Sequence, residues 1–168
     1  MEPTTIHGNL EVEGVIDVED YEITIEDDPI DQALVDAAAN YDIVKIPAGT
    51  YEASSQIKIE SRVTVLAFGV TLEATHDDFR VFELGEDRSH VLGLKVTTNG
   101  TDGDPAHAID LTGDHCTASH FSALSVDFGS DPLRSAGEKN SFTTGVADGL
   151  ADSGTDTITA GVTPLDQS

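Results

Sequence analysis

The chain has 168 residues with 32 Asp and Glu against 8 Lys and Arg, which gives a formal net charge of -24. The acidic residues are spread along the chain between apolar ones, which favours a folded domain over a disordered acidic tail. Because a phosphate-binding surface needs clustered Lys and Arg, the composition argues against nucleic acid as a partner. No apolar run is long enough to cross a membrane, and the first residues lack the basic and apolar parts of an export signal. The single cysteine, Cys116, excludes an intramolecular disulfide.

The first 28 residues contain three short stretches in which apolar and mostly acidic residues alternate, at residues 10–12, 14–18 and 21–25. Alternation with a period of two is typical of strands with one buried face. Pro29 and the acidic residues before it then interrupt the pattern. We therefore predict an N-terminal β segment over residues 1–28 that covers the start of the following domain or docks the protein to a partner.

The most informative stretch runs from residue 31 to residue 72. Its Ala-rich beginning, residues 31–39, opens with the favoured N-cap residue Asp31 and carries apolar residues at helical spacing. Four short β-branched segments follow, each bounded by Gly, Pro, Ser or Glu: residues 43–46, 56–59, 63–66 and 70–72. Strands this short do not suit a hairpin sandwich, and no Asn-Gly or Asp-Gly turn joins them. The stretch predicts one capping helix and then short stacked strands.

Pro47 and Gly49 predict a corner after the first of these strands. Pro47 cannot donate a ladder hydrogen bond and so ends the strand at Ile46, while Gly49 permits the positive φ of a tight turn. Alternate apolar residues would then stack as inward ladders. The expected inward residues are Ile43, Val44, Ile46, Ile57, Ile59, Val63, Val65, Leu66, Val70 and Leu72, and the expected outward residues are Lys45, Lys58 and Thr64. A half-buried antiparallel sheet would use the same alternation, but the brevity of the strands favours stacking.

The segment Ile46-Pro47-Ala48-Gly49-Thr50-Tyr51 resembles the first coils of the pectate-lyase-like right-handed parallel β-helix family. The Ala-rich helix before it and the Ile-x-Ile, Val-x-Val-Leu and Gly-Val-Thr-Leu segments after it extend the resemblance over roughly residues 29–96. This family includes polysaccharide lyases and hydrolases, and phage tailspikes. The resemblance implies an all-β fold, a short right-handed parallel β-helix. It implies function only weakly, because this scaffold hosts enzymes, binding spikes and inert virion parts alike.

Strand-like segments recur further along the chain, at residues 79–84, 90–96, 108–111 and 121–126. Comparable apolar positions repeat about every 20 residues, at the short end of solenoid periods. We therefore expect the β-helix to fill residues 29–128. From residue 129 onward Gly, Ser, Thr, Asp and Ala surround scattered apolar residues without a sustained period. This composition predicts an extended or partner-ordered C-terminal arm over residues 129–168.

Carboxylate pairs are the first candidates for chemistry, because glycoside hydrolysis uses two carboxylates held close together. The candidate pairs are Asp77 with Asp78, near Arg80, and Asp102 with Asp104. A solvated acidic surface explains both pairs equally well, and the arginines that a lyase would need, Arg62, Arg80 and Arg88, stand in no recognisable lyase signature. We predict no catalytic residue and no cofactor.

A metal site is the second candidate. Six possible ligands lie close together in the sequence: His107, Asp110, Asp114, His115, Cys116 and His120. Their spacing matches no standard zinc pattern, and the Asp102-x-Asp104 pair lacks the rest of an EF-hand calcium loop. Cys116 is better explained as a small buried residue than as a nucleophile. The sequence leaves the presence of a metal site open.

The composition resembles that of haloarchaeal proteins, including those of their viruses. In molar salt the Debye length falls to roughly 3 Å, so repulsion between surface carboxylates is screened, whereas in dilute buffer it destabilises the folded state. An acidic mesophilic domain that binds cations or a basic partner is the alternative. A short solenoid also has two open ends that need caps or partners, so we expect a homo-oligomer, with a trimer favoured.

Three functions remain open from the sequence. The first, which we expect, is a virion structural protein of a haloarchaeal tailed virus without catalytic activity: a capsid decoration, turret or spike. Such a protein would be assembled in the host cytoplasm and located in the virion, with other virion proteins such as the major capsid protein as partners. The second is a tailspike-like protein that binds or degrades host surface glycans, although the chain has no Trp. The third is a cellular haloarchaeal surface-layer or polymer-binding module.

Overall fold

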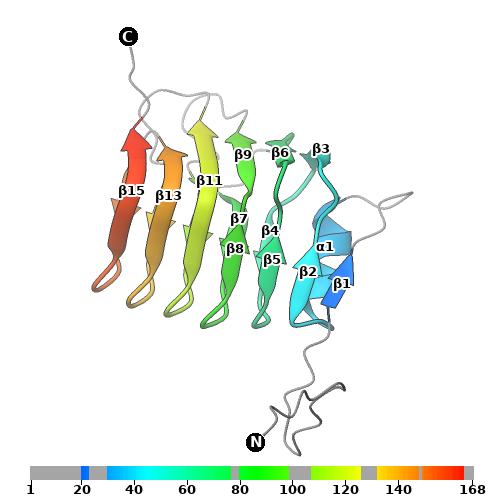
Figure 1. The fold of residues 1–168 in the computed structure, drawn as a ribbon, viewed down its shortest axis with the longest axis horizontal. Coiled ribbons are helices and arrows are strands. Elements are labelled where there is room, and N and C mark those ends of the chain that lie inside the picture. Colours follow the sequence, from blue (N-terminus) through cyan, green and yellow to red (C-terminus); the bar gives the residue numbers. More distant parts are fainter. Residues whose placement is uncertain are drawn as a thin grey trace, which may run out of the picture.

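The computed structural model describes residues 20–22, 30–76, 80–98, 107–125, 132–147 and 149–164. They form a right-handed parallel β-solenoid with one helix near its N-terminal end (Figure 1). This confirms the predicted fold class, all-β with a parallel β-helix. Every pair of described strands is parallel, which excludes the antiparallel sheet for this part of the chain.

The strands are mostly three to five residues long and follow one another around the solenoid. In chain order the elements are β1 (Asp20–Glu22), α1 (Ile30–Ala38), β2 (Ile43–Lys45), β3 (Gly49–Ala53), β4 (Ile57–Ile59), β5 (Thr64–Leu66), β6 (Val70–Ala74), β7 (Arg80–Leu84), β8 (His90–Leu92), β9 (Lys95–Thr98), β10 (His107–Leu111), β11 (Thr117–Ser125), β12 (Leu133–Ser135), β13 (Ser141–Ala147), β14 (Leu150–Asp152) and β15 (Ile158–Pro164). No helix in the described part of the chain has the length and apolar character that crossing a bilayer requires.

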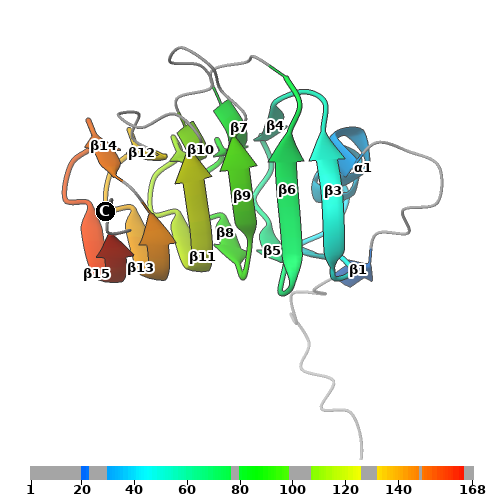
Figure 2. The ribbon, with the colours of Figure 1, turned by 90° about the horizontal axis from the view of Figure 1, so that it is seen from above.

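Two sheets enclose the core (Figure 2). In the 10-stranded sheet, β2, β5 and β8 stack as one arm and β3, β6 and β9 as a second arm, and the long strand β11 pairs with both β8 and β9. The 5-stranded sheet stacks β4, β7, β10, β12 and β14 on the other side of the core. A coil such as β2, β3 and β4 therefore contributes one strand to each arm of the 10-stranded sheet and one strand to the 5-stranded sheet.

Apolar side chains at equivalent rungs fill the interior as columns. One column, paired rung to rung, consists of Val44, Val65, Val91, Ala118 and Phe142, all 0% exposed. A second runs through Ile57, Phe82, Ile109 and Leu133 on the 5-stranded sheet. The residues that the alternation predicted to point inward are buried, except Ile43 and Leu66, which are half-buried. A one-residue slip would expose every column, so burial holds the register.

Residues with a left-handed backbone build two corners of the coil. One column of them precedes the first strand of successive coils and consists of Arg88, His115, Lys139 and Asp156. The φ angle of every non-Gly residue with a left-handed backbone in the described part of the chain lies between 53° and 61°. The second column separates the two arms of the 10-stranded sheet and contains Gly69, Gly93, His120, Thr144 and Gly161. The same backbone solution thus repeats from coil to coil although the residues differ.

Gly49 has a different role from the one predicted. It begins β3 and is not among the residues with positive φ. A Cβ at Gly49 would lie 3.1 Å from the hydroxyl of Tyr51, whose ring folds back so that this hydroxyl donates a hydrogen bond to the Pro47 carbonyl over 2.7 Å. Space for the Tyr51 ring, rather than a turn conformation, therefore accounts for glycine at this position.

The described residues beyond residue 129 continue the solenoid, which corrects the expectation of an extended arm over residues 129–168. β12 pairs with β10, β13 with β11, and β15 with β13. Coils of unequal length hide this repeat in the sequence. Asp87 and Asp114, at the same corner of successive coils, are 27 residues apart, and Asp114 and Glu138 are 24 apart.

At the other end, α1 caps the first coil. It contacts β2, β3 and β4 and buries Ile30, Leu34, Ala37 and Ala38. Asp31 lies inside the first turn and anchors the helix, because its carboxylate accepts 2.8 Å hydrogen bonds from the hydroxyls of Ser54 and Ser55. Burial raises the pKa of Asp31, but the hydrogen bonds from Ser55, Ser54 and Gln32 outweigh it and hold the pKa below its ordinary value. β1 pairs with β2, and the rest of the predicted segment 1–28 lies outside the described residues.

Candidate functional site: a buried charge network and an open end

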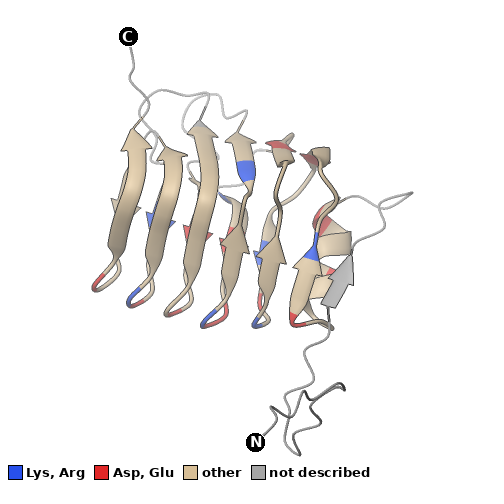
Figure 3. Ribbon diagram, viewed as in Figure 1, with Lys and Arg blue, Asp and Glu red and all other residues tan. Residues whose placement is uncertain are grey.

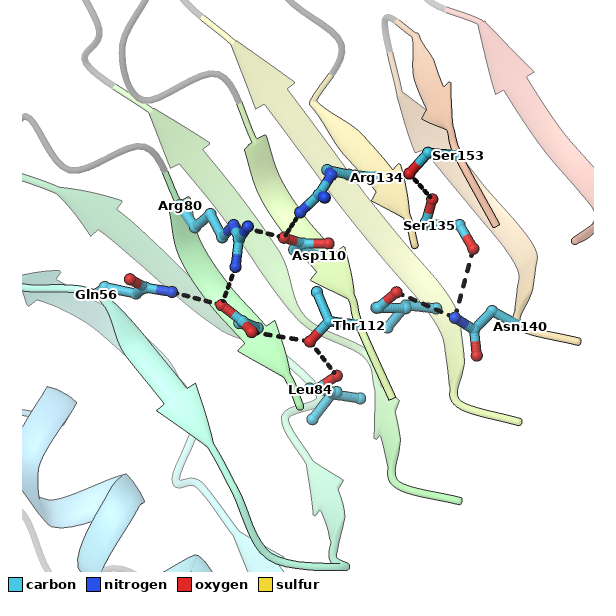
Figure 4. A network of polar contacts seen from close by, with 11 residues as sticks. Gln56, Arg80, Leu84, Asp110, Thr112, Arg134, Ser135, Asn140 and Ser153 are labelled. Carbon is cyan, nitrogen blue, oxygen red and sulfur yellow. Dashed lines mark hydrogen bonds and ion pairs between the residues drawn. The ribbon is translucent and has the colours of Figure 1, made fainter. Parts of the chain in front are cut away.

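A row of charged side chains crosses the outer face of the 5-stranded sheet. Parallel pairing places Lys58, Glu83, Asp110 and Arg134 side by side on β4, β7, β10 and β12. The neighbouring positions in these strands carry the inward column of Phe82 and Ile109, so alternation along each strand turns the charges to the opposite face. Figure 4 shows how Arg80, Gln56 and Thr112 join the row.

Glu83 is 3% exposed and both of its carboxylate oxygens are hydrogen-bonded. Oε2 accepts from Gln56 Nε2 and from the Arg80 guanidinium, each over 2.6 Å, and Oε1 accepts from Thr112 Oγ1 over 2.8 Å. Burial raises the pKa of Glu83, but the bonds from Arg80 and Thr112 outweigh burial and bring the pKa below its ordinary value. Glu83 is therefore held as a carboxylate.

Asp110 is 0% exposed, and two arginines share one of its oxygens. Oδ2 lies 2.8 Å from Arg80 Nε and 2.9 Å from the Arg134 guanidinium, whereas Oδ1 is buried and accepts no hydrogen bond from the part of the chain that the structure describes. Burial raises the pKa of Asp110 above its ordinary value, and Arg134 and Arg80 only partly offset this effect. The pKa values of two adjacent carboxyl groups, Glu83 and Asp110, are thus shifted in opposite directions. This pattern is found both in acid–base pairs and in structural ion networks.

The network joins four successive coils through side chains. Arg80 bridges Glu83 and Asp110, and Arg134 adds the second positive charge, so the two carboxylates and two guanidinium groups sum to zero. Charges that are buried without partners would cost several kcal/mol each, so the two partly exposed arginines allow the carboxylates of Glu83 and Asp110 to be buried. The arrangement binds coils together and leaves Glu83 without a free carboxylate oxygen.

A second polar group in Figure 4 lies inside the solenoid at a corner. Asn140 is 0% exposed; its Oδ1 accepts the backbone N–H of Cys116 over 2.8 Å, and its Nδ2 donates to the carbonyl of Leu111 over 3.0 Å. Ser135, also 0% exposed, accepts from Asn140 Nδ2 and contacts Thr157. These bonds satisfy buried backbone groups where the chain turns, which is a structural role.

The six metal candidates from the sequence, all of which the structure describes, do not gather into one site. Asp77, Asp78, Asp102 and Asp104 lie outside the described residues. Among the described residues no group of three or more His, Cys, Asp or Glu side chains is arranged to hold a metal ion. His107 and Asp110 lie in β10, Asp114, His115 and Cys116 lie at the next corner, and His120 lies at the corner between the two arms. Cys116 is buried and burial raises the pKa of its thiol, in keeping with a small buried residue.

Sequence reasoning did not single out Glu83, Thr112 or Arg134. A signal was present, because Phe-Glu-Leu and Ile-Asp-Leu place an acidic residue between two buried apolar ones in β7 and β10, and Leu-Arg-Ser repeats the arrangement with a base in β12. Aligning these three tripeptides by their apolar residue would have brought the charges into one row.

The last rung of the solenoid is the second notable feature. Every residue of β15 is exposed except Val162, which is half-buried, and Ile158 is 58% exposed. A shallow hollow of about 250 Å³ opens beside it, with apolar walls that include Leu133, Leu150 and Val162. Thr159, which is in register with the buried Phe142, reaches the surface at this end, whereas Ile158 is in register with the half-buried Ser141.

Neither the scan against protein-family models nor the search of the curated proteins finds a match for this chain.

Proposed function

We propose that the protein is a structural building block without catalytic activity that works in an assembly, as a virion component of a haloarchaeal tailed virus such as a capsid decoration, turret or spike. The observation that carries the proposal is the open C-terminal rung. Among the described residues nothing pairs with the outer edge of β15, which also exposes Ile158, while α1 covers the opposite end. An exposed parallel edge is a template for association unless something covers it. We propose that a second copy of the chain does so, in a homo-oligomer for which a trimer is the favoured symmetry.

The charge network supports a structural role over a catalytic one. An acid–base pair must reach its substrate, yet Asp110 is 0% exposed and both oxygens of Glu83 are engaged by neighbours. Removing one partner of such a pair is costly, whereas the complete network fixes the relative position of the coils. A rigid rod with a fixed register suits a particle component.

The charge supports the halophilic part of the proposal. With 32 acidic residues and 8 Lys and Arg, copies of the chain repel one another in dilute buffer and pack closely only where salt screens them. The virion of a haloarchaeal virus, assembled with its major capsid protein in a cytoplasm of molar salt, meets this condition.

Light scattering of the purified protein in molar KCl tests the assembly. We expect the mass of a trimer or other closed oligomer, and a monomer from Ile158→Asp. Phe68→Asp is the matched control, because Phe68 is 57% exposed but lies at the corner between β5 and β6, away from the last rung. A monomeric wild-type protein, or equal masses for wild type and Ile158→Asp, would contradict the proposal. Detecting the chain in purified particles by mass spectrometry tests the virion location.

Binding of host surface glycans, with or without their cleavage, is the second candidate, and Phe68 is the observation that favours it. Its exposed ring lies over Gly93, where a Cβ would be 2.6 Å from Phe68 Cδ1, and its centroid is 6.3 Å from that of His120. An exposed ring held in this way offers a flat face to a sugar. If this candidate is right, host surface polysaccharide binds the wild-type protein and Phe68→Ala abolishes that binding.

A further inference from the structure

A groove of about 360 Å³ lies at the N-terminal ends of β2, β5 and β8 in the 10-stranded sheet, where three turns stack. It is lined in part by Asp42, Arg62, Arg88 and His90. The three turns precede β2, β5 and β8, which stack in register through Ile43, Thr64 and His90. Figure 3 shows basic residues, in blue, at the turns before β5 and β8 and an acidic residue, in red, at the turn before β2. Stacking of the coils therefore brings two arginines to one groove.

These two arginines differ from the other two in the chain. Arg80 and Arg134 bind the buried carboxylates of the network. The guanidinium groups of Arg62 and Arg88, both exposed residues, form no ion pair or hydrogen bond within the described ranges. They stay unpaired there although the chain has four acidic residues for every basic one. The groove is thus lined by two guanidinium groups whose N–H donors are available to a ligand. Asp42 is the one carboxylate among the described residues that line it.

His90 reports the electrostatics of the groove. The ring is half-buried, and burial together with the positive charge of Arg62 lowers the pKa of His90 below its ordinary value. The charged groups that line the same groove are Arg62, Arg88 and Asp42. Burial is the larger cause, and the positive charge of Arg62, which lines the same groove, adds to it because a nearby positive charge disfavours the imidazolium.

We infer that this groove binds a phosphate or sulfate group between Arg62 and Arg88. The planar guanidinium fork donates two parallel hydrogen bonds to an oxyanion, and two forks that face one groove fit a tetrahedral group with several acceptor oxygens. A neighbouring hollow of about 230 Å³ shares Asp42 and Arg62 with the groove and is also lined by Asn40 and Ser61. Its polar side chains suit the hydroxyl-bearing remainder of a small ester. The site therefore takes a tetrahedral oxyanion, free or as a small phosphate or sulfate ester.

Calorimetric titration in molar KCl with inorganic phosphate, inorganic sulfate and glucose 6-phosphate tests the site, with acetate as the planar anion for comparison. Screening to about 3 Å removes long-range attraction, so binding that remains reports direct contacts. We expect tetrahedral anions to bind more tightly than acetate, and Arg62→Gln or Arg88→Gln to weaken their binding by about tenfold or more. A larger affinity for glucose 6-phosphate than for phosphate assigns the ester, and equal affinities assign the free anion.

Lys139→Gln is the matched control. Lys139 is exposed and occupies the same left-handed corner position as Arg88, but it does not line the groove. Its replacement should leave affinity unchanged. As an independent readout, phosphate should raise the pKa of His90 followed by NMR, because a bound anion favours the imidazolium, while His120 at the opposite corner should not respond. Wild-type affinity in both arginine variants, equal weakening by Lys139→Gln, or an unchanged pKa of His90 would overturn the inference.

Discussion

The two ends of the solenoid are built from similar coils but finished differently. At the N-terminal end, α1 covers the first coil, Leu34 is 0% exposed and Asp31 ties the helix to Ser54 and Ser55. At the C-terminal end, β15 ends the described stack with Ile158 58% exposed. In a solenoid each coil contacts only its neighbours, so an uncovered last coil lacks half of its contacts. Within the described residues α1 thus covers one end of the solenoid and no element covers the other, where we propose that a partner binds.

The largest expected difference in stability comes from placing an aspartate in a central rung and in the last rung. Val65 is 0% exposed in a central column, so Val65→Asp buries an unpaired carboxylate and should prevent folding. Ile158→Asp places the carboxylate in solvent and should leave the monomer folded. Circular dichroism and thermal melts in molar KCl measure both. A normally folded Val65→Asp would show that the column of β2, β5 and β8 is out of register.

Glycine at the corner between the arms gives a second contrast. At Gly93, with φ 82°, a Cβ would lie 2.8 Å from the Phe68 Cα, whereas at Gly161, with φ 67°, its nearest contact would be 3.6 Å away on Thr144. We expect Gly93→Ala to cost about 3 kcal/mol and Gly161→Ala about 1 kcal/mol, because only the first adds a clash to the backbone strain. Urea unfolding in molar KCl checks the order. Equal losses would mean that the central coils relax as freely as the last one.

The charge network predicts a smaller effect that depends on pH. Glu83→Gln should cost about 1–3 kcal/mol at neutral pH, because Arg80 loses one of its charged partners and keeps Asp110. The folded-state pKa of Glu83 lies below its unfolded value, so its stabilising contribution is present above about pH 4.3 and is lost as the pH falls through the folded pKa. The gap between wild type and variant should therefore close on acidification.

Glu60→Gln is the control for this experiment. Glu60 pairs with Lys58 at the surface, with side chains 71% and 47% exposed, so its loss should change stability by no more than about 0.5 kcal/mol. The unfolding free energies of both variants, measured at acidic and at neutral pH, show whether the loss of stability depends on the charge of Glu83. A pH-independent cost for Glu83→Gln would assign its role to packing rather than to charge.

The concentration of salt should change the stability of the whole chain, and the effect on any single coil should be the smallest of those predicted here. We expect the melting temperature to fall as KCl drops from molar to millimolar, because repulsion among the acidic residues is no longer screened. The C-terminal coils should open first, since one face of their stack is uncovered. A melt that does not respond to salt would contradict the halophilic interpretation.

The sequence predicted the described fold well where apolar alternation is strong. Ile57, Ile59 and Val65 were assigned to inward ladders and are buried. It failed after residue 129, where Gly, Ser, Thr and Ala take rungs that earlier coils fill with Val, Leu and Ile, so the alternation fades although β13 pairs with β11 over its length. Backbone pairing and left-handed corners continue the stack there, with Leu133 and Phe142 as the large apolar side chains that remain in its buried columns.

The charge network was hidden for a different reason. Acidic residues are so frequent that Glu83 and Asp110 do not stand out, and only the register of β7 with β10 makes them neighbours. The groove is a similar case, because Arg62 and Arg88 lie in different coils and meet through stacking. Residues brought together by coils of unequal length cannot be paired by counting along the chain.

Hydrogen–deuterium exchange in molar KCl, read separately for β15 and β13, tests most directly whether the open end is an assembly surface. At high protein concentration we expect the amides of β15 to be protected nearly as well as those of β13, because a second copy covers the free edge. Dilution, or Ile158→Asp, should remove the protection of β15 alone. Fast exchange of β15 at every concentration would contradict the account, since the last rung would then remain uncovered.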